Sequence, residues 1–436
     1  MHLSFGGRNK PKTQVHRVLH AYFLMFLVLF SLTEIYSQCG NFRFWNQKDV
    51  DSFIIKNPTC THVTSLYVNG IDITNLRGLK NIVKIDSLLF LENLPKLPNL
   101  LDLSNLHTKL GRLVIIYCKN LKSFKGLENI TINGDGFTLV QLDIDTIDIP
   151  IHIENSRSIS ISGCSKLVDM NALIIDTVRR ISLTDNQELQ NLDVFNNVKN
   201  AELIYITNCD KLTRIPDFKQ LNDLVIFTVE SCDNLVDFSS LSQRDIKLTA
   251  INLRNNKQLK SLSGLNFRIR QTLGTKIAIT NNPLLNDISY LKTEENMDFD
   301  SLIIQGNPNL SICNNDWLCK YISIAKPSKL RIADNSGDCL NLDAVKEKCK
   351  ATSIEDQFLN VGKRAILCFP NPATDQIFFY SEWGGAHFKI YNTQGQLVSS
   401  GISNKRSIQV NSLKSDIYFI VAVKNGRSHY QKLVKE

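Results

Sequence analysis

The chain has 436 residues, a formal net charge of +8 and 43% hydrophobic residues, which allows two or three domains with a sizeable core. The positive charge is concentrated at the two ends. Residues 1–38 carry four Lys/Arg and one acidic residue, residues 363–436 carry ten and four, and the part between them is close to neutral. This balance argues against a nucleic-acid partner held through phosphate contacts.

Residues 1–37 are typical of a secretory signal peptide. The basic stretch MHLSFGGRNKPKTQVHR is followed by the apolar run AYFLMFLVLFSL and by TEIYSQ, in which Ser37 is the small residue before a cleavage point. The apolar run is too short to span a bilayer comfortably, so we expect no permanent transmembrane helix. A retained signal anchor is one alternative. Lipidation of Cys39 is another, although Gln38 is an unfavourable residue to precede it.

A repeat with a period of about 23 residues occupies the centre of the chain. Each copy has an Asn or Cys three residues before a Leu, as in ITNCDKL, VESCDNL and LRNNKQL, and is apolar three and five residues before that position. This alternation predicts one short strand per copy. One copy, after the first, is unmatched, and LYVNGIDITNLRGLKNI aligns poorly but is assigned to the same region. The repeated positions are Cys118, Cys164, Asn186, Cys209, Cys232, Asn256, Asn282 and Asn307.

Stacking of the copies explains the repeated Asn or Cys. One strand with its return cannot bury its own apolar face, so successive copies must share a core. The Asn or Cys then lies in the turn after the strand, where inward backbone groups need partners. Asn supplies two donors and an acceptor, and Cys supplies a weaker donor. We therefore predict a buried ladder within a mainly β solenoid over residues 63–312, with an N-terminal cap at residues 38–62.

The repeat resembles leucine-rich repeats, whose L-x-x-L-x-L-x-x-N/C-x-L pattern it matches in the strand and ladder positions. It is most similar to the short coils of receptor-L-type domains of secreted bacterial proteins, over about residues 60–318. The resemblance implies a solenoid whose sheet presents a binding surface. For each outward residue, simple filling of an exposed strand is the alternative. The candidate surface residues are Thr184, Tyr205, Thr207, Thr228, Glu230, Asn252, Arg254, Thr280 and Gln305.

Six cysteines lie at the two ends of the predicted solenoid, and export to an oxidising compartment favours disulfides between them. The four cysteines of the C-terminal cap, residues 313–350, allow three pairings, of which analogy with other repeat-protein caps favours one. A zinc site is the alternative, but the spacings are not C-x-x-C. The ladder cysteines are expected to be buried thiols, with a Cys209–Cys232 bridge as their alternative. The predicted pairs are Cys39–Cys60, Cys313–Cys339 and Cys319–Cys349.

After a polar linker at residues 351–364, strand alternation and Gly turns predict a small antiparallel β-sandwich at residues 365–436. FPNPATDQI, IYNTQGQLV, NSLKSDIYFIVA and the terminal QKLVKE resemble the type A C-terminal sorting domain of the type IX secretion system of Bacteroidetes, although Asp416 stands where Gly is usual. The resemblance implies passage through the periplasm, recognition by an outer-membrane translocon, and removal by a sortase-like peptidase. An ordinary β-sandwich is the alternative. The matching residues are Pro370, Asn371, Pro372, Asp375, Gly395 and Tyr418.

The sequence contains no H-E-x-x-H, G-x-S-x-G or P-loop pattern, so we expect no enzymatic activity, cofactor or metal. Asp143, Asp145 and Asp148 could bind a cation, but their alternation with apolar residues favours outward-facing strand carboxylates. We expect a secreted or outer-surface recognition protein with a protein or glycan partner. A surface spacer or matrix protein without a ligand is the alternative, and a hydrolase is disfavoured.

Overall fold

The structure, a computed structural model, describes residues 39–436 except 223, 240–246, 266–267, 270–273, 294–299, 314, 350–367, 380–382, 404–406 and 425–426. The predicted signal peptide and the predicted linker lie outside these residues. The chain divides into two compact units, which are described separately. The first contains the residues up to Leu310 together with Ala325–Ser336, and the second contains Ser311–Ile324 and Gly337–Glu436.

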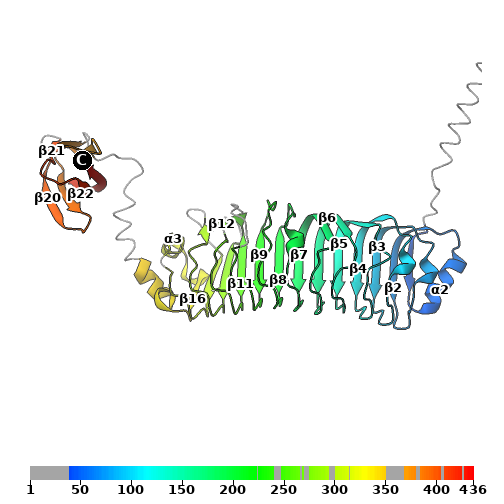
Figure 1. Cartoon of the computed structure of the whole chain (residues 1–436). Coiled ribbons are helices and arrows are strands. Elements are labelled where there is room, and N and C mark those ends of the chain that lie inside the picture. The colour runs from blue at the N-terminus through cyan, green and yellow to red at the C-terminus, as the bar shows by residue number, and fades with distance from the viewer. Residues whose placement is uncertain are drawn as a thin grey trace, which may run out of the picture. The chain divides into compact units, whose positions relative to one another are not determined.

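A long parallel sheet runs the length of the first unit (Figure 1). Neighbouring strands in the sheet follow chain order, so each coil of the chain adds one strand. Among the described residues the sheet has thirteen strands: β1 (Asn41–Phe44), β2 (His62–Asn69), β3 (Lys84–Glu92), β4 (Thr108–Ile116), β5 (Ile130–Val140), β6 (Ile151–Ser162), β7 (Leu173–Thr184), β8 (Leu203–Thr207), β9 (Ile226–Glu230), β11 (Ala250–Arg254), β13 (Lys276–Thr280), β15 (Ser301–Gln305) and β16 (Leu330–Ala333).

The strand register confirms a solenoid with a period of about 23 residues. In the regular middle of the sheet, for example, Ile181 lies opposite Ile204. The poorly aligned stretch contributes β2, and the unmatched copy is β5. The sheet also extends beyond the predicted limits of 63–312. β1 lies in the segment predicted as the N-terminal cap, and β16 lies in the segment predicted as the C-terminal cysteine cap.

Each coil returns through short, mostly irregular segments that bury large apolar side chains. Three returns contain 3₁₀ turns, η1 (Arg77–Leu79), η2 (Leu101–Leu103) and η3 (Asp193–Phe195). A small parallel sheet is formed by β10 (Lys247–Leu248), β12 (Arg268–Ile269) and β14 (Lys292–Thr293). Full burial of one large apolar side chain contributes about 1.5–3 kcal/mol. Of the fully buried phenylalanines, Phe124, Phe195 and Phe238 lie in the returns, and Phe137 and Phe227 lie on β5 and β9.

A left-handed residue ends the strand in eleven successive coils and turns the chain inward. These residues have φ values of 51° to 70°. Gly, Asn and Asp adopt this conformation most readily, and they fill eight of the eleven positions. The N–H groups of the first ten each donate one further hydrogen bond to the next strand, as from Asn208 to the Glu230 carbonyl at 2.9 Å. The residues are Asn93, Tyr117, Gln141, Gly163, Asp185, Asn208, Ser231, Asn255, Asn281, Gly306 and Asp334.

The N-terminal end of the solenoid carries a capped helix, α2 (Gln47–Lys56). The Asn46 side chain accepts a hydrogen bond from the Asp49 N–H at 2.9 Å, which satisfies one of the free donors of the first turn. Val50 and Phe53 are buried. A disulfide joins Cys39 to Cys60 on either side of β1 and α2. This end of the chain is therefore held both by helix packing and by a covalent link.

Four cysteines of the second unit pair among themselves. Cys313 is bonded to Cys339 and Cys319 to Cys349, which is the pairing that the resemblance favoured. Cys319 belongs to helix α3 (Asp316–Ile324), which buries Trp317, Leu318, Tyr321 and Ile322. The short η4 (Pro327–Lys329) precedes β16, and η5 (Gly337–Cys339) ends at a bonded cysteine. No helix within the described ranges is long and apolar enough to cross a bilayer.

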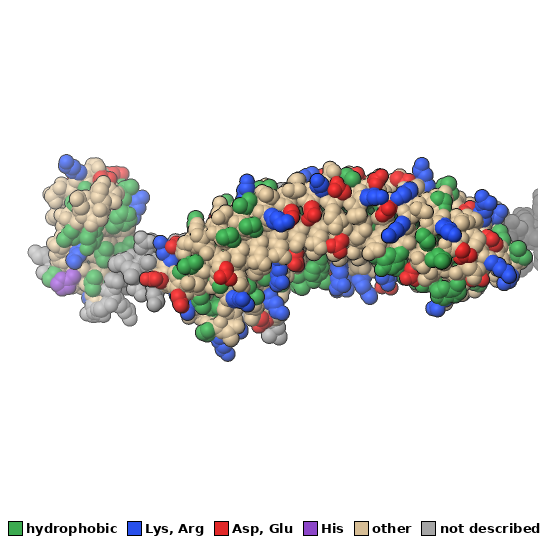
Figure 2. All heavy atoms as spheres, turned by 90° about the horizontal axis from the view of Figure 1, so that it is seen from below, with side chains coloured by type: hydrophobic (Ala, Val, Ile, Leu, Met, Phe, Trp, Pro, Cys, Tyr) green, Lys and Arg blue, Asp and Glu red, His purple; other side chains and the backbone are tan. Residues whose placement is uncertain are grey.

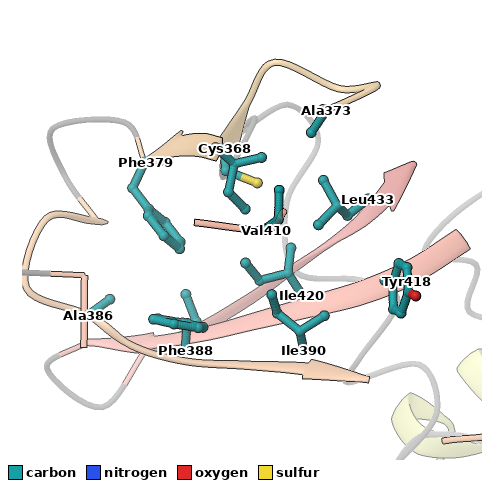
Figure 3. Close-up of a cluster of buried hydrophobic side chains, with 12 residues drawn as sticks. Cys368, Ala373, Phe379, Ala386, Phe388, Ile390, Val410, Tyr418, Ile420 and Leu433 are labelled. Atoms are coloured by element: carbon teal, nitrogen blue, oxygen red, sulfur yellow. The ribbon is translucent and has the colours of Figure 1, made fainter. Parts of the chain in front are cut away.

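The C-terminal residues form two small antiparallel sheets around one apolar cluster (Figure 3). Phe388, Ile390, Tyr418 and Ile420 from one sheet and Phe379 from the other point into this cluster. The predicted antiparallel β fold is confirmed. The first sheet contains β17 (Cys368–Phe369), β18 (Gln376–Phe379) and β21 (Ser407–Gln409), and the second contains β20 (Leu397–Ile402), β19 (His387–Asn392), β22 (Asp416–Lys424) and β23 (Arg427–Lys435).

Candidate binding face and sorting domain

The repeated asparagines form a hydrogen-bonded ladder inside the solenoid. Asn256 is fully buried, and its side-chain oxygen accepts from the Cys232 N–H of the preceding coil at 3.0 Å. Its amide Nδ2 donates to the Val229 carbonyl of that coil at 3.1 Å. Asn186, Asn282 and Asn307 make the same pair of contacts to the coil before them. Each of these asparagines therefore satisfies two buried backbone groups of its neighbour.

The ladder contains one asparagine that the repeat pattern did not identify. Asn335, after β16, accepts from the Asn307 N–H at 3.1 Å and donates to the Ile304 carbonyl at 2.9 Å. Leu330 and Ile332 stand five and three residues before it, as in the other copies, but Asp338 replaces the Leu that should follow. The apolar pair Leu330 and Ile332 was the sequence signal that could have identified Asn335 as a ladder residue.

The cysteines at the ladder position make weaker hydrogen bonds than the asparagines do. They lie in the N-terminal and central coils of the solenoid. Cys118, Cys209 and Cys232 approach the carbonyls of their own and the preceding coil with Sγ–O distances of 3.3 to 4.0 Å. Cys164 contacts only a carbonyl of its own coil, Ser162, at 3.9 Å. Leu94 and Leu142 fill the equivalent positions in two coils that lack Asn or Cys, and both are fully buried. A cysteine or an apolar residue can therefore occupy the ladder position in coils that have no asparagine there.

Burial controls the chemistry of these thiols. It raises the pKa of Cys118 to about 12 and that of Cys164 to about 11. For Cys232, the largest cause of the raised pKa is a hydrogen bond with the Cys209 side chain, and burial is the second. The structure has no bridge between Cys209 and Cys232. Because the reactive form of cysteine is the thiolate, these groups are chemically protected in the folded protein.

We expect the native protein, treated with iodoacetamide at mildly alkaline pH, to leave its five unbonded cysteines unmodified. The same treatment in denaturant without reductant should label those five and none of the six disulfide cysteines, which mass spectrometry of peptides can resolve. Modification of Cys118 before unfolding would contradict the buried ladder. The five are Cys118, Cys164, Cys209, Cys232 and Cys368.

The nine predicted surface residues fall in two straight rows on the outer face of the sheet, the side opposite the ladder and core. One row contains Thr184, Thr207, Glu230, Arg254, Thr280 and Gln305, and the other contains Tyr205, Thr228 and Asn252. Eight are half-buried, and Thr228 is only 8% exposed. Within the rows Asn252 Nδ2 donates to Thr228 Oγ1 at 3.2 Å. This part of the outer face is a flat polar strip held on rigid strands.

The same two rows continue into an aromatic region at the N-terminal end of the outer face, which the repeat pattern did not identify. Tyr67 and Phe90 lie in register on β2 and β3, and Trp45 follows β1. Trp45 is 53% exposed. The region was missed because β1 lies in the predicted cap and β2 in the stretch that aligned poorly. The neighbouring LYV and LFLE sequences, each with an aromatic between two buried residues, were the available signal.

Charges of both signs are interspersed over the solenoid (Figure 2). Asp143, Asp145 and Asp148 do not lie on a strand as expected but in the irregular segment after β5. Lys166 bonds to Asp143 at 3.1 Å and lowers the pKa of that carboxyl, and the Phe124 N–H donates to Asp148 at 2.8 Å. The described ranges contain no group of three or more His, Cys, Asp or Glu that could hold a metal ion.

The motif residues of the C-terminal domain mostly hold its last strand in place. Asn371 Nδ2 donates to the Lys432 carbonyl at 2.5 Å, and its oxygen accepts from the Val434 N–H at 2.8 Å. Gln431 similarly exchanges two hydrogen bonds with the Cys368 backbone, at 2.9 and 3.0 Å. These hydrogen bonds thus link the start of the domain to its last strand. The terminal residues are therefore part of the fold.

The other predicted sorting residues lie at turns and in the core. Gly395 has a φ of 78° in the turn between β19 and β20, and Tyr418 is buried with its hydroxyl donating to the Lys414 carbonyl at 3.0 Å. Pro370, Pro372 and Asp375 are exposed.

Comparison with known proteins finds a family that resembles the C-terminal residues of the chain. None of the curated proteins matches the chain. Residues 367–436 match the model of the secretion system C-terminal sorting domain family, two residues inside the predicted start at 365. The C-terminal sandwich is thus similar to type IX sorting domains, which implies that the protein is exported to the outer cell surface or secreted.

Proposed function

We propose that the protein is a non-enzymatic recognition protein of the cell surface or the surrounding medium, and that the outer face of its solenoid binds a protein or glycan. The observation that carries the proposal is the uninterrupted outer face, on which two rows of side chains cross successive strands in register. Strands bound to both neighbours are rigid, and a rigid sheet orders few side chains on binding. The match to a sorting-domain family supports export of this face to the outside of the cell.

The ladder supports a relationship to leucine-rich repeats of the receptor-L type. Asn or Cys follows nine of the described strands, as the N/C position of the repeat pattern predicts, and the asparagines bond to the preceding coil. Together with residues 1–37 as a signal peptide and the sorting domain, this supports an origin in Bacteroidetes. On this proposal a sortase-like peptidase removes the C-terminal domain after translocation.

The test is a panel of immobilised oligosaccharides and extracellular proteins probed with the protein produced from residue 39 onward. Thr207→Arg with Thr280→Arg places two bulky charges on the outer face. The matched control, Asn129→Arg with Gln190→Arg, places the same charges at exposed positions outside the strands of the sheet. We expect binding to at least one class of ligand, weakened by the first pair by about tenfold or more and unchanged by the second. Absence of binding to every member would favour a spacer or matrix role instead.

A further inference from the structure

The aromatic end of the outer face is formed by three rings in contact. The ring centroids of Trp45 and Tyr67 are 5.3 Å apart, and those of Tyr67 and Phe90 are 4.9 Å apart. The Arg43 guanidinium lies over the Tyr67 ring, 5.9 Å from its centroid. Val114, the next residue along this row, is only 3% exposed, so the exposed rings end there. The rings form a compact platform and not a long apolar strip.

Polar groups beside the platform are fixed by one another. The Tyr67 hydroxyl donates to Glu92 Oε2, and Asn69 Nδ2 donates to the same oxygen at 3.0 Å and to the Tyr67 hydroxyl at 3.2 Å. The Asn69 donor lowers the pKa of Tyr67, but the bond to Glu92 and partial desolvation outweigh it, so the pKa is raised. Tyr67 therefore remains a donor at neutral pH. Strands β2 and β3 hold all three side chains in register.

The remaining polar atoms are available to a ligand. Within the described part of the chain, Glu92 Oε1, Asn69 Oδ1 and Trp45 Nε1 make no hydrogen bond. Two of these atoms accept hydrogen bonds, and the indole N–H donates. The platform therefore combines aromatic rings with an edge rich in hydrogen-bond acceptors. The side chains of this edge are already held in place by hydrogen bonds to one another, and such an arrangement orients a small ligand.

We propose that this platform, formed by Trp45, Tyr67, Phe90, Asn69, Glu92 and Arg43, binds neutral saccharides. A pyranose ring has an apolar face of C–H groups, which stacks on an aromatic ring, and an edge of hydroxyls, which donate to carboxylate and amide oxygens. The Glu92 carboxylate disfavours saccharides that place a carboxylate or sulfate at the acceptor edge of the platform. The proposal rests on the proposed binding function and names the ligand class for one end of the outer face.

The test uses the protein produced from residue 39 onward on an array of neutral, uronic-acid and sulfated oligosaccharides, with a panel of extracellular proteins on the same surface. Trp45→Ala should weaken binding to neutral saccharides by about tenfold or more, because the most exposed ring is lost. Tyr290→Ala removes another exposed aromatic, 41% exposed and outside the platform, and should leave binding unchanged. Glu92→Gln keeps an acceptor and removes the negative charge, so it should admit acidic saccharides.

The outcomes of this test distinguish a failure of the saccharide proposal from a failure of the proposal that the outer face binds a partner. Equal saccharide binding by the wild type and Trp45→Ala would overturn the platform. Trp45-dependent binding to a protein but to no saccharide would overturn the ligand class and retain the recognition function. No binding to any member would overturn both. Matching urea midpoints of the variants and the wild type establish that lost binding is not lost folding.

Discussion

A chain that ends before residue 367 should fold its solenoid and fail to reach the cell surface. The buried cluster of the sorting domain is formed by residues between Cys368 and Leu433, so truncation before residue 367 removes this cluster as a whole. The sorting domain is the part that matches a known export family. We therefore expect the truncated protein to accumulate in the periplasm of its native host, as measured by fractionation and by protease accessibility on whole cells.

Finer changes within the sorting domain can show that its fold, and not merely its presence, is required. Asn371→Ala removes the two hydrogen bonds that hold the end of β23, whereas Asn411→Ala changes an exposed asparagine of a turn. We expect reduced surface delivery for the first variant and normal delivery for the second. Surface delivery of the truncated chain at the level of the full chain would show that this domain is not the export signal.

Asn256→Ala should lower the free energy of unfolding of the protein produced from residue 39 onward by about 2–6 kcal/mol, because each of two buried polar groups left without a partner costs about 1–3 kcal/mol. The substitution leaves the Cys232 N–H and the Val229 carbonyl without the partners they have in the ladder. Both belong to the preceding coil, so the damage crosses the interface between coils. Urea unfolding followed by tryptophan fluorescence and circular dichroism measures the change.

Asn252→Ala is the matched control, because it removes the same side chain from the same coil on the outer face. Among the described residues the Asn252 side chain makes one hydrogen bond, to Thr228 Oγ1 at 3.2 Å, and Asn252 is half-buried. Its loss should change the free energy of unfolding by less than about 0.5 kcal/mol. Equal midpoints for the two variants would contradict the assignment of one asparagine to the inside and the other to the outside.

The repeat and its strands could be predicted because each coil encodes them locally, whereas the disulfide pairing of the C-terminal cap was favoured only by analogy with other repeat-protein caps. Apolar residues three and five before the ladder position point inward in any coil, so Leu253 and Ile251 are buried wherever the neighbours lie. The ladder asparagine sits after a left-handed residue, and Asn, Asp or Gly at that position are visible in the sequence. The sorting motifs are likewise contiguous, which is why residues 365–436 could be recognised.

The limits of the sheet and the aromatic platform were decided only by the tertiary structure. β1 and β16 carry no complete repeat pattern, and each becomes a strand because the adjacent coil presents a free edge with unpaired backbone groups. Tyr67 and Phe90 are far apart in the chain, and their contact depends on the register between β2 and β3. Pairing register between coils is a non-local property, because it results from hydrogen bonds that no single coil contains.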